Sequence, residues 1–167
     1  MNNKLVLFFV LSLFGSFVLA DLPTFNVEAC SSPILWNTTA STNSTAFYLA
    51  DCSGPALQQT VVNACYDNTY LHLHFYCLDN NIYSPYTQCN DHLYNDDVVE
   101  VFIAPDLPND DPIHNYIELE LSPNGILFAA DVTNPDLTCN GITDDNYPCS
   151  YFTYSAQRYD DEGYWTG

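Results

Sequence analysis

The sequence predicts an all-β protein, built as an antiparallel β-sandwich with jelly-roll or immunoglobulin-like layers. No window shows the sustained apolar period of a helix, whereas apolar and polar residues alternate in several runs. In the clearest of these, "LHLHFY", Leu71, Leu73 and Phe75 share one face of a strand, while the histidines and Tyr76 share the other. Turn motifs separate the runs at short spacing, which is typical of two packed antiparallel sheets.

Each expected strand is an apolar or alternating run bounded by turn residues. The motif "YDNT" separates the second and third runs, "PDLPNDDP" precedes the fifth, "SPNG" follows it, and "NPDLTCNG" comes later. The gap 79–96 is the longest between them, and loops of this length are usually functional or mobile. The expected strands are Phe47–Ala50, Thr60–Tyr66, Tyr70–Leu78, Val98–Ala104, Tyr116–Leu121, Gly125–Val132 and Ser150–Arg158.

Residues 1–20 have the features of a secretory signal peptide. Lys4 precedes an apolar centre, and Val18 and Ala20 occupy the small-residue positions before Asp21. Removal of this segment from the 167 residues leaves 147, which suits one domain over residues 21–167. No later stretch approaches the roughly 20 apolar residues of a spanning helix. We therefore expect a secreted protein that does not insert into a membrane after cleavage.

The expected mature domain is strongly acidic. Loss of Lys4 leaves Arg158 as the single Lys or Arg against 21 acidic residues, a formal charge of −20. Nucleic acid and anionic membranes need clustered positive charge on their protein partners, so neither is an expected partner. Acidic polysaccharides are disfavoured for the same reason. The acidity accords with solubility and, as a second interpretation, with the binding of divalent cations.

All seven cysteines follow the predicted signal peptide, so disulfides are expected in an oxidising compartment. Their odd number leaves one spare, and sequence alone leaves the connectivity open. Two local pairs are conceivable, Cys139 with Cys149 and Cys77 with Cys89. Sequons beginning at Asn37 and Asn43 predict an exposed, glycosylated N-terminal region.

The stretch "HLYNDDVVEVFIAP" places three carboxylates near the start of an expected strand. Asp96, Asp97 and Glu100 could supply the acid and base of a glycosidase. Nothing in the sequence sets their separation, and such acidic runs are more often solvated rims or cation ligands. A nucleophile elbow, a phosphate-binding glycine loop and a metalloprotease histidine pair are all absent from the sequence. We therefore expect no catalytic residues and no enzyme.

Two kinds of metal site are conceivable. His72 and His74 lie two apart on a strand, and could bind a transition metal together with Glu118 or Glu120. The favoured interpretation of these histidines is a polar, solvated sheet face. Calcium is the better metal candidate, because hard oxygen ligands are abundant in "YNDD", "PNDDP", "TDDN" and "YDDE". None of these runs is an EF-hand, so a structural calcium ion is expected without assigned ligands.

The long loop is rich in tyrosine. Of thirteen tyrosines in the chain, Tyr83, Tyr86 and Tyr94 lie in it. The apolar face of a sugar ring stacks on an aromatic plane, while neighbouring Asp, Glu, Asn or Gln side chains bind the hydroxyls. The alternative is that the tyrosines pack beneath the loop with their hydroxyl groups hydrogen-bonded. Composition alone does not separate these two interpretations.

Three consecutive motifs favour the sugar site. They are "YDNTYLHLHFYCLD", "LYNDDVVEVFIAP" and "NYIELELSPNGILFAAD", which together span about Thr60–Asp131. In this order they resemble the family 9 carbohydrate-binding modules, within the broader group of DOMON-type sandwiches. Outside that span, Trp36 and "GYWTG" resemble framework tryptophan positions of the family.

The resemblance implies specific site residues. In sugar-binding members, an aromatic residue before the D-x-V-E motif forms one wall of a sugar clamp, and the glutamate of the motif bonds sugar hydroxyls. Tyr94 and Glu100 occupy these positions here. Some related sandwiches carry haem on Met and His ligands, but the single methionine is Met1, so no haem is expected.

The chain also departs from the family pattern. The aromatic wall is Tyr rather than the frequent Trp, and Glu118 stands where some members have Arg, which gives an acidic face of Glu100, Glu118 and Glu120. These changes weaken any transfer of glucan specificity. The resemblance further implies additional strands and a second aromatic wall after Gly167, so the sandwich is expected to lack its last strands.

The sequence thus predicts a secreted, non-catalytic carbohydrate-binding domain for a neutral polysaccharide or oligosaccharide. The expected binding residues are Tyr94, Glu100, Glu118, Tyr86 and Tyr83. One alternative is an extracellular structural or adhesion domain that kept the fold without sugar binding. Another is the binding module of a larger secreted glycan-active enzyme.

Overall fold

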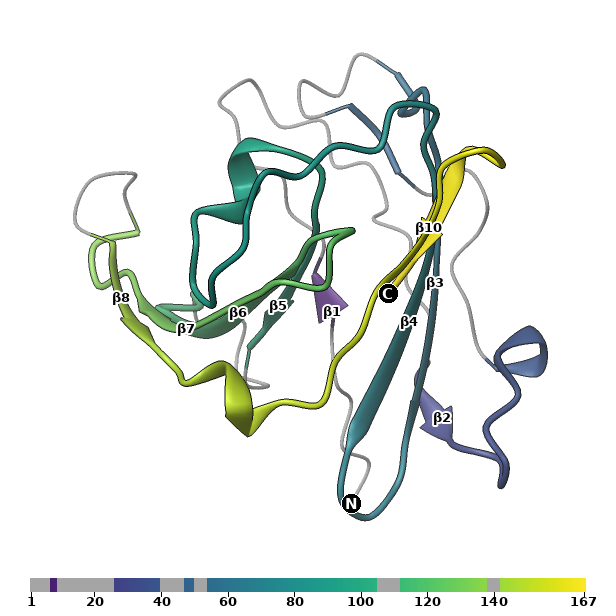
Figure 1. The fold of residues 1–167 in the computed structure, drawn as a ribbon. Coiled ribbons are helices and arrows are strands. Elements are labelled where there is room, and N and C mark those ends of the chain that lie inside the picture. The colour runs from purple at the N-terminus through teal and green to yellow at the C-terminus, as the bar shows by residue number, and fades with distance from the viewer. Residues whose placement is uncertain (1–6, 9–25, 40–46, 50–53, 105–111, 138–141) are drawn as a thin grey trace.

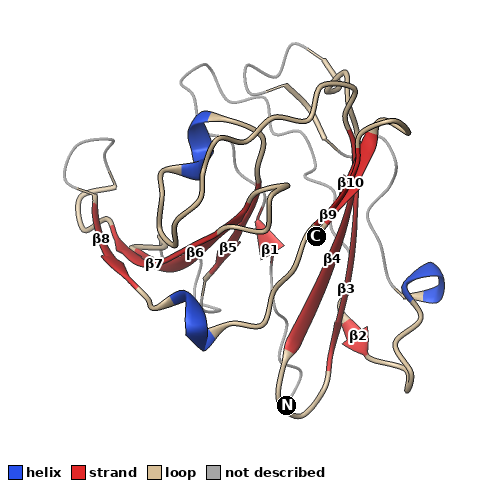
Figure 2. Cartoon of the chain, viewed as in Figure 1, coloured by secondary structure: helices blue, strands red, loops and turns tan. Residues whose placement is uncertain are grey.

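The computed structural model describes residues 7–8, 26–39, 47–49, 54–104, 112–137 and 142–167, which are mostly strands and loops (Figures 1 and 2). None of the helices in these ranges is long and apolar enough to cross a membrane. The described 3-10 helices are η1 Trp36–Thr38, η2 Leu93–Asn95 and η4 Cys149–Tyr151. The strands are β1 Leu7–Phe8, β2 Glu28–Ala29, β3 Thr60–Tyr66, β4 Leu71–Leu78, β5 Val99–Ile103, β6 Asn115–Leu121, β7 Leu127–Thr133, β8 Thr143–Asn146, β9 Gln157–Tyr159 and β10 Tyr164–Thr166.

The strands form two sheets, and the predicted all-β sandwich is confirmed. Sheet A has the strand order β1-β5-β6-β7-β8, and its pairings are antiparallel. Sheet B has the order β2-β3-β4-β10-β9, in which only the pairing of β2 with β3 is parallel. In sheet B, β10 therefore lies beside β4, although the two strands are far apart in the sequence (Figure 1).

The hairpin of β3 and β4 shows how local sequence produces the fold. Its turn is held by Asp67, whose Oδ1 accepts the backbone N–H groups of Thr69 at 2.7 Å and Tyr70 at 2.8 Å. Aspartate favours such turns because its short side chain reaches the backbone two residues ahead. The resulting register places Val62 opposite Phe75, so the alternating apolar residues of both strands point to one face.

The main core lies between the two sheets. Val62, Phe75 and Trp165 from sheet B pack with Val101 from sheet A, and each of the four is at most 5% exposed. The predicted framework role of the tryptophan in "GYWTG" fits this position, because Trp165 is 2% exposed. Burial of this apolar surface is the main force that holds the sheets together.

A second apolar cluster lies on the opposite face of sheet A. Residues 79–98, which we term the covering segment, leave β4 and cross over β6 and β7 before entering β5 (Figure 1). Leu93 of this segment is fully buried and packs in a cluster with Phe128, Ala130 and Val132 of β7. The predicted long loop therefore forms a layer over sheet A.

Most predicted strands are confirmed to within two residues, but the segment Ser150–Arg158 is wrong as a single strand. Its beginning forms η4, and regular pairing starts only at β9. Pro148 directly precedes η4, and prolines occur readily at the first turn of a helix. Of the predicted Phe47–Ala50 strand, Tyr48 forms an isolated bridge with Pro55, and Ala50 lies outside the described residues.

Four described strands were not predicted, namely β1, β2, β8 and β10, and the last two lack an apolar pattern of useful length. β8 has the sequence "TDDN" and is exposed throughout, and β10 is three residues long. β8 pairs only with β7 in the described sheet and β10 lies between β4 and β9. Both are strands because neighbouring strands pair with them, which local sequence does not reveal.

The strand β1 lies within the predicted signal peptide. Its backbone pairs Leu7 with Ile103 and Phe8 with Phe102 of β5. Cleavage after Ala20 would remove this pairing and leave β5 as an edge of sheet A.

Both conceivable local disulfides are wrong. Cys89 is bonded to Cys149, 60 residues later, and Cys30 is bonded to Cys65. Cys77 is buried and free, so it is a spare cysteine of the described residues, while Cys52 and Cys139 lie outside them. Of the predicted glycosylation sites, Asn37 is exposed in η1 and Asn43 lies outside the described residues.

Candidate functional site

Arg158 holds the start of the covering segment. It is expected to be the only Lys or Arg of the mature chain. Its Nη2 donates to the carbonyl of Ile82, and its Nη1 donates to Oδ1 of Asn124, each over 2.9 Å. The guanidinium also pairs with Asp160. Asn124 in turn donates from Nδ2 to the carbonyl of Ser84 at 2.5 Å. The "SPNG" turn and β9 thus fix the first residues of the segment.

The middle of the segment is attached to β7 and η4. Asn90 donates its backbone N–H to the Leu127 carbonyl and accepts the Ala129 N–H at Oδ1, each at 3.0 Å. It also donates from Nδ2 to the Tyr147 carbonyl, while the adjacent Cys89 is bonded to Cys149. Asn90 has a φ of 63°, a left-handed conformation that asparagine adopts more readily than most residues. These bonds hold the segment against β7.

Three glutamates converge beneath the covering segment. The register of β5 and β6 places Glu100 opposite Glu120 and Phe102 opposite Glu118. Alternate residues on a strand share a face, so Glu100, Glu118 and Glu120 all point to the side of sheet A that carries the second cluster. The acidic face predicted from the sequence is therefore formed, and we term it the glutamate cluster.

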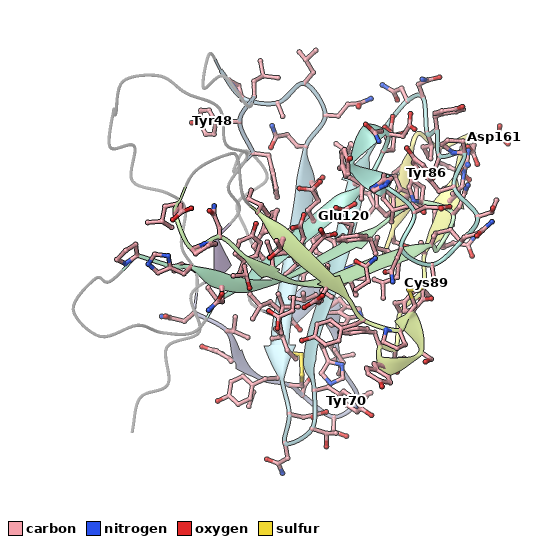
Figure 3. All side chains as sticks on the ribbon, turned by 90° about the vertical axis from the view of Figure 1, so that its left-hand side faces the viewer. Tyr48, Tyr70, Tyr86, Cys89, Glu120 and Asp161 are labelled. Carbon is pink, nitrogen blue, oxygen red and sulfur yellow. A yellow bond between two sulfur atoms is a disulfide. The ribbon has the colours of Figure 1, made fainter. Side chains whose placement is uncertain are left out.

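The most buried member of this cluster is Glu120, which is 2% exposed (Figure 3). Its Oε2 has no hydrogen-bond partner among the described residues. Burial, and then the negative charges of Glu100 and Glu118, raise the pKa of Glu120 to about 8. Burial also raises the pKa of Glu118, with a further contribution from Glu100. Negative charge at this position is consequently destabilised by its surroundings.

Tyr94 lies beside the glutamate cluster. Its backbone N–H is near enough to lower the pKa of Glu120, against the larger effect of burial. The side chain of Tyr94 is 58% exposed, and its ring meets His92 edge to face at 5.7 Å. The backbone of Tyr94 therefore lies over the glutamate cluster, while its ring is open to solvent.

The other two predicted tyrosines lie elsewhere on the covering segment. Tyr83 is 56% exposed, and its backbone N–H donates to Oδ2 of Asp97. Tyr86 is half-buried and packs against the cluster around Leu93, and burial followed by the Asp96 carboxylate raises its pKa. The described contacts bring Tyr94, Glu100 and Glu118 together at Glu120, and they do not join Tyr83 or Tyr86 to this group.

A second acidic group lies where the covering segment leaves β4 and enters β5. Asp79 and Asp97 face one another there, and burial followed by the charge of Asp79 raises the pKa of Asp97. Asp79 accepts hydrogen bonds from the Asn81 N–H and from Gln58. Gln58, Asp79 and Asp97 border a pocket of about 240 Å³, which is also lined by Thr60, Cys77, Leu78, Asp96, Val98, Val99 and Trp165.

The described residues contain no group of three or more His, Cys, Asp or Glu side chains arranged to hold a metal ion. The conceivable histidine site is not formed, because His72 and His74 lie on sheet B and Glu118 and Glu120 on sheet A. His72 pairs with Asp67 at 2.9 Å, and His74 stacks on Trp36.

The four acidic runs proposed for calcium have different positions. "TDDN" forms β8, whose side chains alternate between faces, and "YDDE" includes the turn after β9 where Asp160 pairs with Arg158. "PNDDP" lies outside the described residues except for Pro112. "YNDD" includes Asp97, which with Asp79 supplies two carboxylates and so fits a calcium ion in part.

Sequence reasoning did not identify the residues that position the site. Asn124 was noted only as a turn residue, Arg158 only as a charge, and Asn90 was not noted. The single basic residue of an acidic chain was an available signal, because such a charge is surrounded by acceptors. No local pattern indicates that Asn90 pairs with β7.

No protein-family profile matches the chain, and no solved structure shows a significant match. An "Extracellular protein" of Arthroderma benhamiae is 34% identical to it over 79 residues, which are 46% of this chain and 34% of the relative. The chain thus covers about a third of the length of that relative. The name of the relative and the two described disulfides fit a secreted domain.

Proposed function

We propose that the chain is a secreted, non-catalytic carbohydrate-binding domain that resembles the family 9 modules and takes a neutral polysaccharide or oligosaccharide. The observation that carries the proposal is that Tyr94, whose ring is exposed, places its backbone N–H near Glu120 of the glutamate cluster. An aromatic face and adjacent carboxyl groups are the two elements that a sugar ring requires.

The site is suited to binding because its parts are held by separate anchors. Tyr94 follows the buried Leu93, which fixes the segment to β7, while Glu100 and Glu118 lie on paired strands. A ligand would therefore meet groups that are already in place, and less conformational entropy would be lost on binding.

A structural or adhesion domain is the second candidate. It is favoured by Tyr86, since the side chain of this predicted sugar-binding residue of the covering segment packs against the second apolar cluster. On this view the covering segment serves stability, and the exposed tyrosines have no ligand. The binding module of a larger glycan-active enzyme is a third candidate, with the same local site.

A glycan array with the full-length mature protein tests the first proposal, followed by calorimetric titration of any bound glycan. Tyr94→Ala and Glu100→Gln should each weaken binding about tenfold or more, because they remove stacking surface and a hydrogen bond to an ionised acceptor. Both variants should melt close to the parent temperature.

Leu73→Ala is the matched control. Leu73 packs against the core between the sheets, so its loss should cost roughly 2–5 kcal/mol of stability. It should affect binding only through unfolding. The proposal fails if no glycan binds, or if Tyr94→Ala and Glu100→Gln bind as well as the parent and melt earlier.

A further inference from the structure

We propose that Tyr76 and Tyr164, whose rings stack on the outer face of sheet B, are a site of oxidative cross-linking, where a peroxidase and hydrogen peroxide join them as dityrosine. The two ring centroids are 4.8 Å apart, with an angle of 30° between the ring planes. The link would tie β10 to β4 covalently. It does not depend on glycan binding, because both residues lie on the sheet that does not carry the glutamate cluster.

The register of sheet B brings three tyrosines to one face. Trp165 of β10 pairs with Cys77 of β4, and both are buried against the core, so their neighbours Tyr164 and Tyr76 point away from it. Tyr159 of β9 lies directly opposite Tyr164, and the two ring centroids are 4.4 Å apart. In the part of the chain that the structure describes, only these three tyrosines have rings in contact with one another.

The proposed reaction takes one hydrogen atom, a proton with an electron, from each phenol hydroxyl. The peroxidase passes both hydrogen atoms to one molecule of hydrogen peroxide, whose O–O bond breaks to give two molecules of water. The two phenoxyl radicals then form one carbon–carbon bond between ring carbons next to the phenolic oxygens. The hydrogen on each of those carbons moves to the oxygen beside it. The tyrosines are thus oxidised by two electrons in total, and the peroxide is reduced by two.

Strand geometry favours Tyr76 over Tyr159 as the partner of Tyr164. Directly opposite residues of antiparallel strands, such as Tyr159 and Tyr164, have Cβ atoms about 4.5–5.5 Å apart. Tyr76 lies opposite Thr166, so it is a diagonal neighbour of Tyr164, and diagonal neighbours are separated by roughly 7–8 Å. In dityrosine the rings are joined at their edges and lie side by side, which requires the wider spacing.

The usual targets of peroxide are scarce in this chain. Methionine and free cysteine are common sites of oxidation. The single methionine is Met1, in the predicted signal peptide, and Cys77 is buried. Tyr76 is 36% exposed, so its ring is open to an oxidant. Tyrosine is therefore a main oxidisable group on the described surface.

Coupling within one molecule is favoured over coupling between molecules. The strong negative charge of the chain opposes the close approach of two copies. A radical on Tyr76 already contacts the ring of Tyr164. Reactants held in contact behave as though they were at a very high concentration.

The link would secure strands that the described disulfides do not reach. Those disulfides join Cys30 to Cys65 and Cys89 to Cys149, and neither β9 nor β10 contains a cysteine. A covalent link between distant residues restricts the unfolded chain, as a disulfide does. The cross-linked protein should therefore melt at a higher temperature than the untreated protein.

Treatment of the dilute mature protein with a peroxidase and hydrogen peroxide tests the inference. The monomer, isolated by size-exclusion chromatography, should show dityrosine fluorescence. Peptide mapping after reduction of the disulfides should find the Tyr76 peptide linked to the Tyr164 peptide, with the loss of two hydrogen atoms. Dityrosine found only in covalent dimers would overturn the inference. A Tyr159–Tyr164 link in place of the Tyr76–Tyr164 link would overturn the choice of Tyr76.

Phenylalanine variants keep the ring and remove the hydroxyl group that is oxidised. Tyr76→Phe and Tyr164→Phe should each lose most of the dityrosine of the monomer. Tyr151→Phe is the matched control, because it changes a tyrosine that is 74% exposed, and it should keep the parent yield. Thermal melts of the untreated variants check their folding, and the peptide map of the parent stands if a variant does not fold. A parent yield of monomer dityrosine in folded Tyr164→Phe would overturn the inference.

Discussion

The guanidinium of Arg158 donates from Nη1 to Oδ1 of Asn124 over 2.9 Å, and so joins β9 to the turn between β6 and β7. Because Asn124 also binds the Ser84 carbonyl, these two residues form one path of hydrogen bonds into the covering segment. The position of that segment over sheet A places Tyr94 beside Glu120. The hydrogen bond between Arg158 and Asn124 thus helps to hold Tyr94 beside Glu120, although both residues are distant from Tyr94 in the sequence.

Arg158→Ala should lower the free energy of unfolding by about 1–3 kcal/mol, because it leaves the Ile82 carbonyl and Asn124 without their donors. Amide hydrogen exchange in the covering segment should become faster. Arg158→Lys should lose most of the same stability, since a lysine cannot make the forked contact.

A double-mutant cycle with Asn124→Ala should give a coupling free energy above about 0.5 kcal/mol. Denaturant unfolding of the four proteins measures it. If Arg158→Lys were as stable as the parent, charge rather than hydrogen-bond geometry would explain the role of Arg158.

Replacement of Cys89 and Cys149 together by serine should cost roughly 2–5 kcal/mol of stability. It should also loosen the covering segment, because this disulfide ties the segment to η4. Peptide mapping of the unreduced protein should find the linked pair Cys89–Cys149. Recovery of Cys149 linked to Cys139 would contradict the structure.

The reactivity of Cys77 tests the same arrangement of cysteines in a second way. Its thiol is buried, and burial raises its pKa to about 12. Because the thiolate is the reactive form, an alkylating reagent near neutral pH should modify Cys77 only after unfolding. Labelling of the folded protein at Cys77 would contradict this placement.

The sequence predicted those parts of the fold that depend on alternation within one strand. The run from Leu71 to Leu78 is an example, because its last four residues alternate between buried and exposed. β8 could not be found this way, since its four residues are all exposed and its pairing with β7 depends on tertiary context. The Cys89–Cys149 disulfide was equally out of reach, because it joins residues 60 apart.

The same distinction applies to the candidate site. Strand periodicity places Glu118 and Glu120 on one face, the family resemblance implied that Glu100 shares this face, and the register of β5 and β6 confirms it. The burial of Glu120 could not be predicted, because it depends on a segment held by Asn90 and other distant contacts. Periodicity gives the direction of a side chain, whereas its environment depends on what packs above it.

Calcium binding remains a prediction, and the Asp79 and Asp97 pair is the place to test it. Two carboxylates that face one another in a partly buried position repel each other unless a proton or a cation lies between them. If an ion binds there, chelation should lower the melting temperature, because the ion binds the folded state preferentially. Asp97→Asn should abolish that dependence, and an unchanged melting temperature of the parent upon chelation would contradict the prediction.

Glu120 should make the folded protein less stable as the pH rises from about 4.5 to about 8, the interval between its ordinary pKa and its raised pKa. Within this interval the folded state keeps a proton on Glu120 that the unfolded state releases, so stability falls with rising pH. The slope from this single group is at most about 1.4 kcal/mol per pH unit.

Glu120→Gln stays neutral at every pH, so it should reduce the slope and be the more stable protein at alkaline pH. Denaturant unfolding of both proteins from pH ~5 to ~9 measures the difference, with Glu162→Gln as an exposed control that should keep the parent slope. If the stability difference between Glu120→Gln and the parent is the same at every pH, Glu120 does not have the raised pKa on which this prediction rests.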